Sequence, residues 1–209
     1  MLSITFPSVL RRIWAFSDDI SYEGQQDLDR ALADRLVEGD PDAVATLVEQ
    51  YADDLYRFVY NQVGGSEQDT EDIVQDTFIA ALKAIRRFRG DSKLRTWLFS
   101  IAVHKAMDRK RYLARRPQIP LQDVTFSLPA SEDKPEQLLE RFEMRQAVRQ
   151  ALLQLPHHYR AALVLKYVEE MTVKEIAQIM DRSVKSVESI LVRARRRLAE
   201  IFEGRYGAP

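Results

Sequence analysis

The 209-residue sequence has no cysteine, few glycines and no long hydrophobic run. Without cysteine there can be no disulfide framework, cysteine-ligated metal centre or cysteine nucleophile. Its seven glycines form neither GxGxxG nor GxxxxGK, so the usual phosphate-cradling loops of nucleotide-dependent enzymes are missing. No apolar run reaches the roughly 18 residues that a membrane-spanning helix needs. We therefore expect a soluble, cytoplasmic chain that binds no cofactor and does not insert into a membrane.

Charge is nearly balanced overall, with a net charge of −1, but it is unevenly distributed. Residues 1–80 carry 17 acidic and 5 basic side chains, whereas residues 81–116 carry 2 acidic and 12 basic ones. An acidic segment, residues 117–143, separates this basic block from a second one over residues 144–209. Such blocks are typical of separate surfaces for a polyanion and for a basic partner. For any single block, an ordinary solvated helix face is the alternative.

Helical periodicity begins at Leu28 and continues to about residue 115. Capping residues divide this segment, because Asp and Ser accept backbone N–H groups at helix starts and Gly ends helices. We expect helix boundaries at Asp40 with Pro41, Gly64 with Gly65, Ser66, Phe88, and Asp91 or Ser92. The pattern predicts one all-helical domain over residues 28–115.

Four prolines interrupt the periodicity between residues 116 and 136, which predicts a flexible linker. Helical spacing then resumes and predicts a second helical domain over residues 137–203, followed by a tail of residues 204–209. Residues 1–27 contain no small-residue cleavage signal and are expected to form a flexible extension. The predicted fold class is therefore all-α, with two small domains joined by a flexible, proline-containing linker.

The segment from residue 172 to residue 198 has the spacing of a helix-turn-helix, because three residues separate a short amphipathic helix from a longer one. In this motif the second helix enters the DNA major groove, and basic residues along it reach phosphates. A helical hairpin with a basic tail is the alternative. The residues expected to face duplex DNA are Lys185, Ser186, Glu188, Ser189, Val192, Arg193, Arg196 and Arg197.

Aromatic and cationic residues alternate between Phe88 and Arg116. This mixture suits unpaired DNA, because bases stack on rings, at about 1–3 kcal/mol per base, while cations neutralise phosphates. Trp97 also lies on the apolar stripe of its helix, so a core role is an equal alternative.

Acidic residues cluster on the helix that begins near Ser66. Asp72 and Asp76 lie four residues apart, where like charges cost a few tenths of a kcal/mol. The helix dipole offsets such repulsion only in the first turn, so Asp76 favours a basic protein partner. A carboxylate pair for metal or acid–base chemistry is the alternative, but no histidine supports a metal site.

Together these segments resemble the bacterial sigma-70 family of RNA polymerase sigma factors, in particular its extracytoplasmic-function (ECF) group. Residues 72–79 (DIVQDTFI) resemble the polymerase-binding signature of the family, and residues 88–92 (FRGDS), 96–98 (TWL) and 101–102 (IA) resemble its promoter-melting segment. Residues 155–156 (LP), 175–177 (EIA), 187–189 (VES) and 193–195 (RAR) resemble its fourth domain. The likeness extends from about Leu28 to Phe202.

The resemblance implies a sigma factor that binds core RNA polymerase and directs promoter recognition, DNA melting and initiation. Residues 28–115 would be sigma domain 2 and residues 137–203 sigma domain 4, whose helix-turn-helix would read the minus-thirty-five element. The clamp helices and flap of polymerase, promoter DNA and an anti-sigma factor are the implied partners. The polymerase-binding residues would be Asp69, Asp72, Ile73, Gln75, Asp76 and Phe78. The minus-ten residues would be Phe88, Arg89, Gly90, Asp91, Ser92, Lys93, Trp97, His104, Lys105, Arg109 and Arg111.

Three positions depart from the family pattern: Glu188 and Ile190, where basic residues are frequent, and His104, where Asn is common. Glu188 could accept a hydrogen bond from a cytosine amino group, or it could pair with Lys185 on the surface. The bond-forming chemistry would belong to polymerase, so we assign no catalytic or metal-binding residue. Two other classes are the alternatives: a helix-turn-helix regulator that binds duplex DNA without polymerase, and a helical adaptor for acidic proteins.

Overall fold

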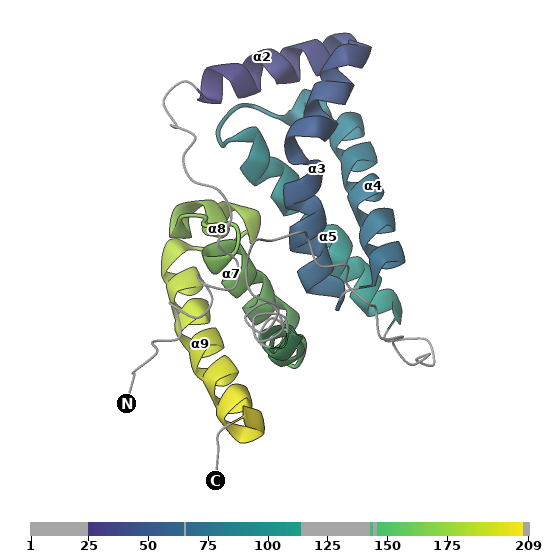
Figure 1. The fold of residues 1–209 in the computed structure, drawn as a ribbon. Coiled ribbons are helices and arrows are strands. Elements are labelled where there is room, and N and C mark those ends of the chain that lie inside the picture. The colour runs from purple at the N-terminus through teal and green to yellow at the C-terminus, as the bar shows by residue number, and fades with distance from the viewer. Residues whose placement is uncertain (1–24, 65, 114–142, 144–145, 207–209) are drawn as a thin grey trace, which may run out of the picture.

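The fold, taken from a computed structural model, is described for residues 25–64, 66–113, 143 and 146–206 (Figure 1). These residues form helices and turns, with no strand among them, which confirms the predicted all-α class. The first bundle contains α2 (Gln25–Glu38), α3 (Pro41–Val63), α4 (Glu67–Ala84), the short 3-10 helix η1 (Ile85–Arg87) and α5 (Leu94–Leu113). The second contains the helical residues 146–153, α7 (His157–Tyr167), α8 (Val173–Ile179) and α9 (Val184–Tyr206). The predicted linker and most of the N-terminal extension lie outside the described residues.

Helix boundaries in the first bundle follow the capping signals in the sequence. The Asp40 carboxylate accepts the Asp42 N–H at 2.9 Å, which makes it the N-cap of α3, with Pro41 as the first helical residue. Gly64 ends α3 in a left-handed conformation, φ +86°. The Ser66 hydroxyl accepts an N–H from the first turn of α4 at 3.2 Å. These boundaries confirm the predictions, except that η1 replaces the last α-helical turn expected before Phe88.

The start of α5 differs from its prediction. Neither Asp91 nor Ser92 caps this helix, which begins at Leu94. Instead the Leu94 N–H donates to the Asp29 carboxylate at 2.7 Å, and Asp29 lies on α2, 65 residues earlier in the chain. Asp29 is 3% exposed and also accepts the Tyr51 hydroxyl at 3.3 Å. A buried carboxylate from another helix therefore fixes where α5 starts.

Each bundle has an apolar core formed by residues at helical spacing. In the first bundle the Phe58 and Phe99 rings, on α3 and α5, lie 5.3 Å apart and are fully buried. In the second, Ile176 of α8 packs with the buried face of α9. Thr172 and Glu175 form a capping box at the start of α8, with each side chain accepting the backbone N–H of the other residue. The core contacts hold α8 and α9 in the predicted helix-turn-helix.

The two bundles pack directly against each other, α7 on α3 and α8 on α5 (Figure 1). Polar groups cross the boundary. The buried Arg160 guanidinium donates to the Leu152 carbonyl at 3.0 Å and also to the Gln62 carbonyl at the end of α3. The Arg149 guanidinium lies 4.9 Å from the Tyr60 ring centroid and donates to its hydroxyl at 2.8 Å. The sequence did not predict this contact between the bundles.

Candidate nucleic-acid and protein interfaces

The helix-turn-helix presents the N-terminal part of α9 to solvent. The turn before α9 contains Asp181 with φ +50°, and the Ser183 hydroxyl accepts the Ser186 N–H at 3.2 Å. The face toward α7 and α8 is apolar, because Val187 and Leu191 are buried. The predicted duplex-contacting residues Lys185, Glu188, Ser189, Val192, Arg193, Arg196 and Arg197 are exposed, and Ser186 is half-buried. One exposed helix face therefore carries the whole set.

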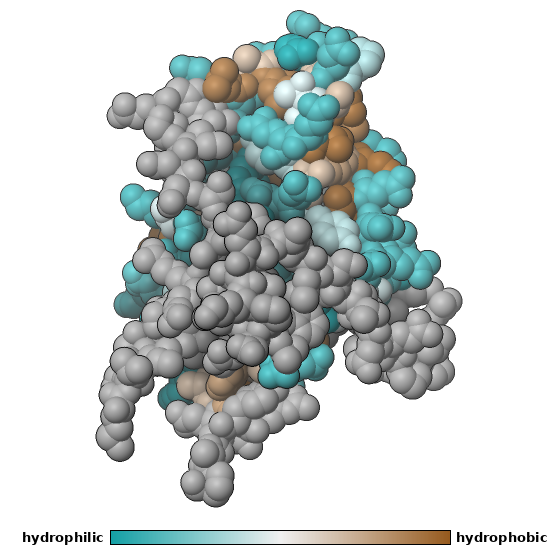
Figure 2. All heavy atoms as spheres, in the orientation of Figure 1, coloured by the Kyte–Doolittle hydropathy of each residue, from teal (hydrophilic) through white to brown (hydrophobic). Residues whose placement is uncertain are grey.

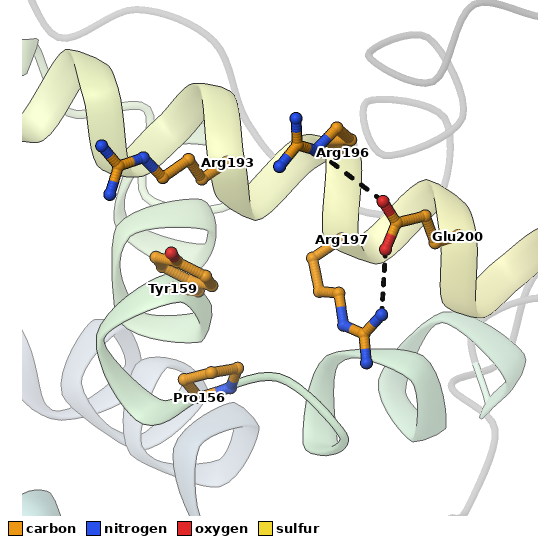
Figure 3. A pocket seen from close by; sticks show the side chains of 6 residues that line it. All are labelled: Pro156, Tyr159, Arg193, Arg196, Arg197 and Glu200. Carbon is orange, nitrogen blue, oxygen red and sulfur yellow. Dashed lines mark hydrogen bonds and ion pairs between the residues drawn. The ribbon is translucent and has the colours of Figure 1, made fainter.

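Three of these arginines lie around a pocket of about 210 Å³ between α9 and α7 (Figure 3). Glu200 pairs with Arg197 at 2.9 Å and with Arg196 at 3.7 Å. Arg193 has no acidic partner in the described part of the chain, and Figure 3 shows it on the same side of the pocket as Tyr159. The charge of Arg193 is therefore the one least compensated within this pocket.

The segment expected to bind unpaired DNA combines half-buried rings with a constrained turn. The Phe88 and Trp97 rings lie 5.5 Å apart, tilted by 50°, and both pack partly against the core. Trp97 therefore combines a core contact with partial exposure. Between them Gly90 has φ +73°, and a Cβ atom there would lie 2.6 Å from the Arg30 Nε. The backbone conformation favours glycine at this turn, whereas the exposed Arg30 side chain could move away from an added Cβ atom.

Arg89, Asp91 and His104 are exposed in this segment, and Ser92 is half-buried. The His104 Nδ1 lies 2.6 Å from the Ser100 carbonyl, which orients the ring.

Most cations of the same segment are paired with carboxylates, which the sequence analysis did not predict. Within the first bundle Lys105 pairs with Asp76 at 3.5 Å and Arg111 with Asp108 at 2.7 Å. Arg95 pairs with Asp54 at 2.9 Å, and Arg109 with Asp69, whose Nε to Oδ1 distance is 2.9 Å. Two cations also pair with domain 4, Lys93 with Glu175 at 2.9 Å and Arg95 with Glu169 at 2.7 Å. The positive charge of this segment is thus partly neutralised within the chain.

The acidic residues of α4 divide between the surface and the bundle. Asp72 and Asp76 keep 58% and 61% of their side chains exposed, and Gln75 is exposed beside them. Asp69 is half-buried under Arg109, whereas Ile73 and Phe78 lie in the core and hold α4 on the bundle. The predicted set therefore separates into outward residues and residues that support them from inside.

Ile79 is an outward residue that the sequence analysis missed. Ile79 is 43% exposed and lies one helical turn beyond Gln75 and Asp76 on α4. Figure 2 shows hydrophobic surface among hydrophilic side chains in the upper part of the view, where α2, α3 and α4 lie. The (i, i+3) spacing from Asp76 is the signal that places Ile79 on this face.

The described residues contain neither a metal cluster nor a membrane-spanning helix. Nowhere in them do three His, Asp or Glu side chains converge as metal ligands would. No helix among them has the length and apolarity needed to cross a membrane.

The geometry defines a two-domain helical DNA-binding protein, with a helix-turn-helix on one domain and a basic, aromatic segment beside an acidic helix on the other. The family described as sigma-70 region 2 matches residues 47–116, and the family described as sigma-70 region 4 matches residues 145–198. The chain belongs to the sigma-70 family and, by its relatives, to the ECF sigma factors, which are transcription initiation factors.

Two curated relatives illustrate the match. The ECF RNA polymerase sigma factor SigW of Bacillus subtilis is 32% identical over 169 residues, which cover 77% of this chain and 89% of SigW. The ECF RNA polymerase sigma-E factor of Escherichia coli K12 is 34% identical over 181 residues, covering 82% of this chain and 92% of sigma-E. Both similarities span the two domains, which supports the sigma factor over an independent duplex-binding regulator.

Solved structures also match. CnrH in complex with the cytosolic domain of CnrY is 30% identical, with a TM-score of 0.62, and covers 84% of this chain and 97% of that chain. RpoE of Bartonella quintana, solved with the anti-sigma factor NepR, is 23% identical with a TM-score of 0.58, and supports the fold.

Proposed function

We propose that the exposed face of α4 binds the clamp helices of core RNA polymerase. Asp72 and Asp76 give this face negative charge, and Ile79 adds an apolar contact beside them. A basic partner would relieve the repulsion between the two carboxylates, which one helical turn separates. The buried Ile73 and Phe78 would position α4 without contacting the partner.

The loop from Phe88 to Lys93 and the start of α5 would bind the opened minus-ten strand. A half-buried Trp97, packed on Phe88, gives a rigid apolar surface for a base that has left the stack. Flipping a base costs a few kcal/mol of stacking, which a preformed site can recover. Because such opening uses binding energy alone, we assign the chain no enzymatic activity of its own.

The exposed N-terminal half of α9 would read the minus-thirty-five element in the major groove, with Arg193 on a phosphate. Domain 4 would also contact the polymerase flap. Both surfaces would act in the cytoplasm, where the polymerase and its template are. The CnrH structure contains the cytosolic domain of a second protein, which supports an anti-sigma factor as a further partner.

The observation that carries this function is the presence, in one chain, of an exposed basic face on α9, a loop with basic and aromatic residues, and an outward acidic helix. Run-off transcription with purified core polymerase on a genomic fragment library tests it. We expect discrete transcripts only when both proteins are present. A duplex-binding regulator would instead bind promoters tightly without polymerase and yield no transcript. A complex with DNA should also weaken steeply as salt rises, because bound phosphates release counterions.

A further inference from the structure

Ion pairs form part of the contact between the two domains, beside the apolar cluster and the Arg149 and Arg160 contacts. Domain 2 supplies Arg57 and Arg95, and domain 4 supplies Glu169, which follows α7. Glu169 Oε2 lies 3.1 Å from the Arg57 guanidinium and 2.7 Å from that of Arg95. Lys93 and Glu175 make a second pair of the same polarity at 2.9 Å. In these two ion-pair sites the cations come from domain 2 and the carboxylates from domain 4, whereas Arg149 and Arg160 of domain 4 bind uncharged groups of domain 2.

The two arginines are held together by a residue of their own domain. Asp54 lies 2.6 Å from Arg57 and 2.9 Å from Arg95, and Arg95 also lies over the Phe99 ring at 4.7 Å. Their arrangement therefore does not depend on Glu169. Two guanidinium groups that converge on one oxygen form a site of the kind that takes a carboxylate or a phosphate.

Glu169 fills this site at a cost. Its side chain is 0% exposed, and burial raises its pKa even though both arginines act in the opposite direction. Gln62 of domain 2, whose carbonyl accepts from Arg160 of domain 4, has a buried side-chain amide with no hydrogen-bond partner among the described residues. Buried polar groups that are unpaired or poorly compensated lose hydration without full recovery. Water would recover both costs if the domains separated, so the contact is suited to reversible opening.

Promoter binding requires such opening. The minus-ten and minus-thirty-five elements are about 25 base pairs apart, or roughly 85 Å along a duplex at 3.4 Å per pair. In the closed chain Lys93, expected at the minus-ten element, lies 2.9 Å from Glu175 on the first helix of the helix-turn-helix. The two domains cannot reach both elements in this arrangement. Separation would uncover Arg57, Lys93 and Arg95 together.

We propose that Arg57 and Arg95, with Lys93, form a backbone-phosphate site for the promoter strand, and that Glu169 occupies this site in the closed chain. The inference rests on the proposed function. Arg95 and Trp97 lie in the first turn of α5 but on different sides of the helix, so a strand that stacks on the ring would cross the N-terminal end of α5 to bring its phosphates to Arg95. Glu169 would then compete with DNA within the chain.

Domain opening is measured first, in the free full-length protein. Because the chain has no cysteine, Glu49→Cys and Gln178→Cys place one dye on each domain. We expect Glu169→Gln to lower energy transfer between the dyes, because it removes the charge that both arginines contact. The matched control is Glu170→Gln, which makes the same charge change at an exposed neighbour and should leave energy transfer unchanged. Circular dichroism checks that both variants keep their helices.

Fork-DNA binding is measured next. If the closed chain is the main free form, Glu169→Gln should lower the apparent Kd by about tenfold, because that Kd varies inversely with the open fraction. Adding Arg95→Gln should abolish the gain and reduce the salt slope by about one, as expected for a lost phosphate contact. If Arg95→Gln alone strengthens DNA binding as Glu169→Gln does, Arg95 only holds the domains together and the phosphate site is overturned.

Two other results would also overturn the proposal. One is unchanged energy transfer in Glu169→Gln, and the other is opening without any gain in DNA affinity. A failure of the proposed function is separate, because it would show as absence of run-off transcription by the parent protein with core polymerase. The energy-transfer measurement needs no polymerase, so the two failures are distinguishable.

Discussion

Arg109 of α5 and Asp69 of α4 form an ion pair, with the Arg109 Nε 2.9 Å from the Asp69 Oδ1. The sequence pattern placed these residues on different surfaces, one for DNA and one for polymerase. In the structure they bind each other and join the two helices. Asp69 also lies in the first turn of α4, where its N–H donates to Ser66. The pair therefore links the two proposed surfaces directly.

Asp76→Arg should weaken binding to core polymerase without unfolding domain 2. Asp76 is 61% exposed, and its ion pair with Lys105 spans 3.5 Å, so little stability depends on it. Reversing its charge places a cation against a basic partner. Co-purification with core polymerase measures the effect, and Asp53→Arg, an exposed residue of α3, is the control. If the Asp76 variant co-purifies as well as the parent, the polymerase surface lies elsewhere.

Arg193→Ala should weaken binding to the upstream element more than Arg197→Ala. Arg197 is already paired with Glu200 at 2.9 Å, whereas Arg193 has no acidic partner in the described residues. Loss of one phosphate contact should lower the salt slope by about one and affect all sequences similarly. Fluorescence anisotropy with duplex DNA over a range of salt measures both quantities. Equal effects of the two substitutions would contradict this assignment.

Glu188→Arg should change base preference at one position of the upstream element. Glu188 is exposed, and no ion pair joins it to Lys185 in the described part of the chain, which favours base readout over a surface pair. One lost base contact is worth about 1–3 kcal/mol of discrimination. Binding to a series of single-base promoter variants measures it, with Glu170→Arg as the control. No change at any base would rule out readout by Glu188.

Asp29→Ala should destabilise domain 2 by about 1–3 kcal/mol, because it leaves the buried Leu94 N–H without its acceptor. Asp27→Ala, an exposed position on the same helix, should cost no more than a few tenths of a kcal/mol. Urea denaturation followed by circular dichroism measures the free energy of unfolding. Similar values for the two variants would mean that α5 does not depend on this cap.

Local signals in the sequence were sufficient for much of the fold. Asp40, Gly64 and Ser66 mark helix ends because capping depends on residues within a few positions. The helix-turn-helix was predicted for the same reason, since a short helix, a turn and a longer helix follow one another directly in the chain. The predictions on the linker and N-terminal extension fall mainly outside the described residues and remain predictions.

Contacts between distant residues were not predictable in this way. Asp29 and Leu94 are 65 positions apart, and Arg57 and Glu169 are 112 apart, so no helical period relates them. The candidate site shows the same division. Outward positions such as Asp72 and Asp76 follow from spacing, whereas Ile73 and Phe78 were included through the family signature and lie in the core. Roles of individual site residues remain predictions until the experiments above are done.

The Arg160 side chain joins the ends of two helical segments, one in each domain. It donates to carbonyls at the end of helical residues 146–153 and to the Gln62 carbonyl near the end of α3. Burial lowers its pKa to about 10, so it stays protonated at neutral pH. When the domains separate, the Gln62 carbonyl in the last turn of α3 loses its hydrogen bond from Arg160. That turn then frays more easily. The rate of amide hydrogen exchange around Gly64 would therefore rise with the fraction of molecules in which the domains are separated. Measuring that rate would report on interdomain motion without any added label.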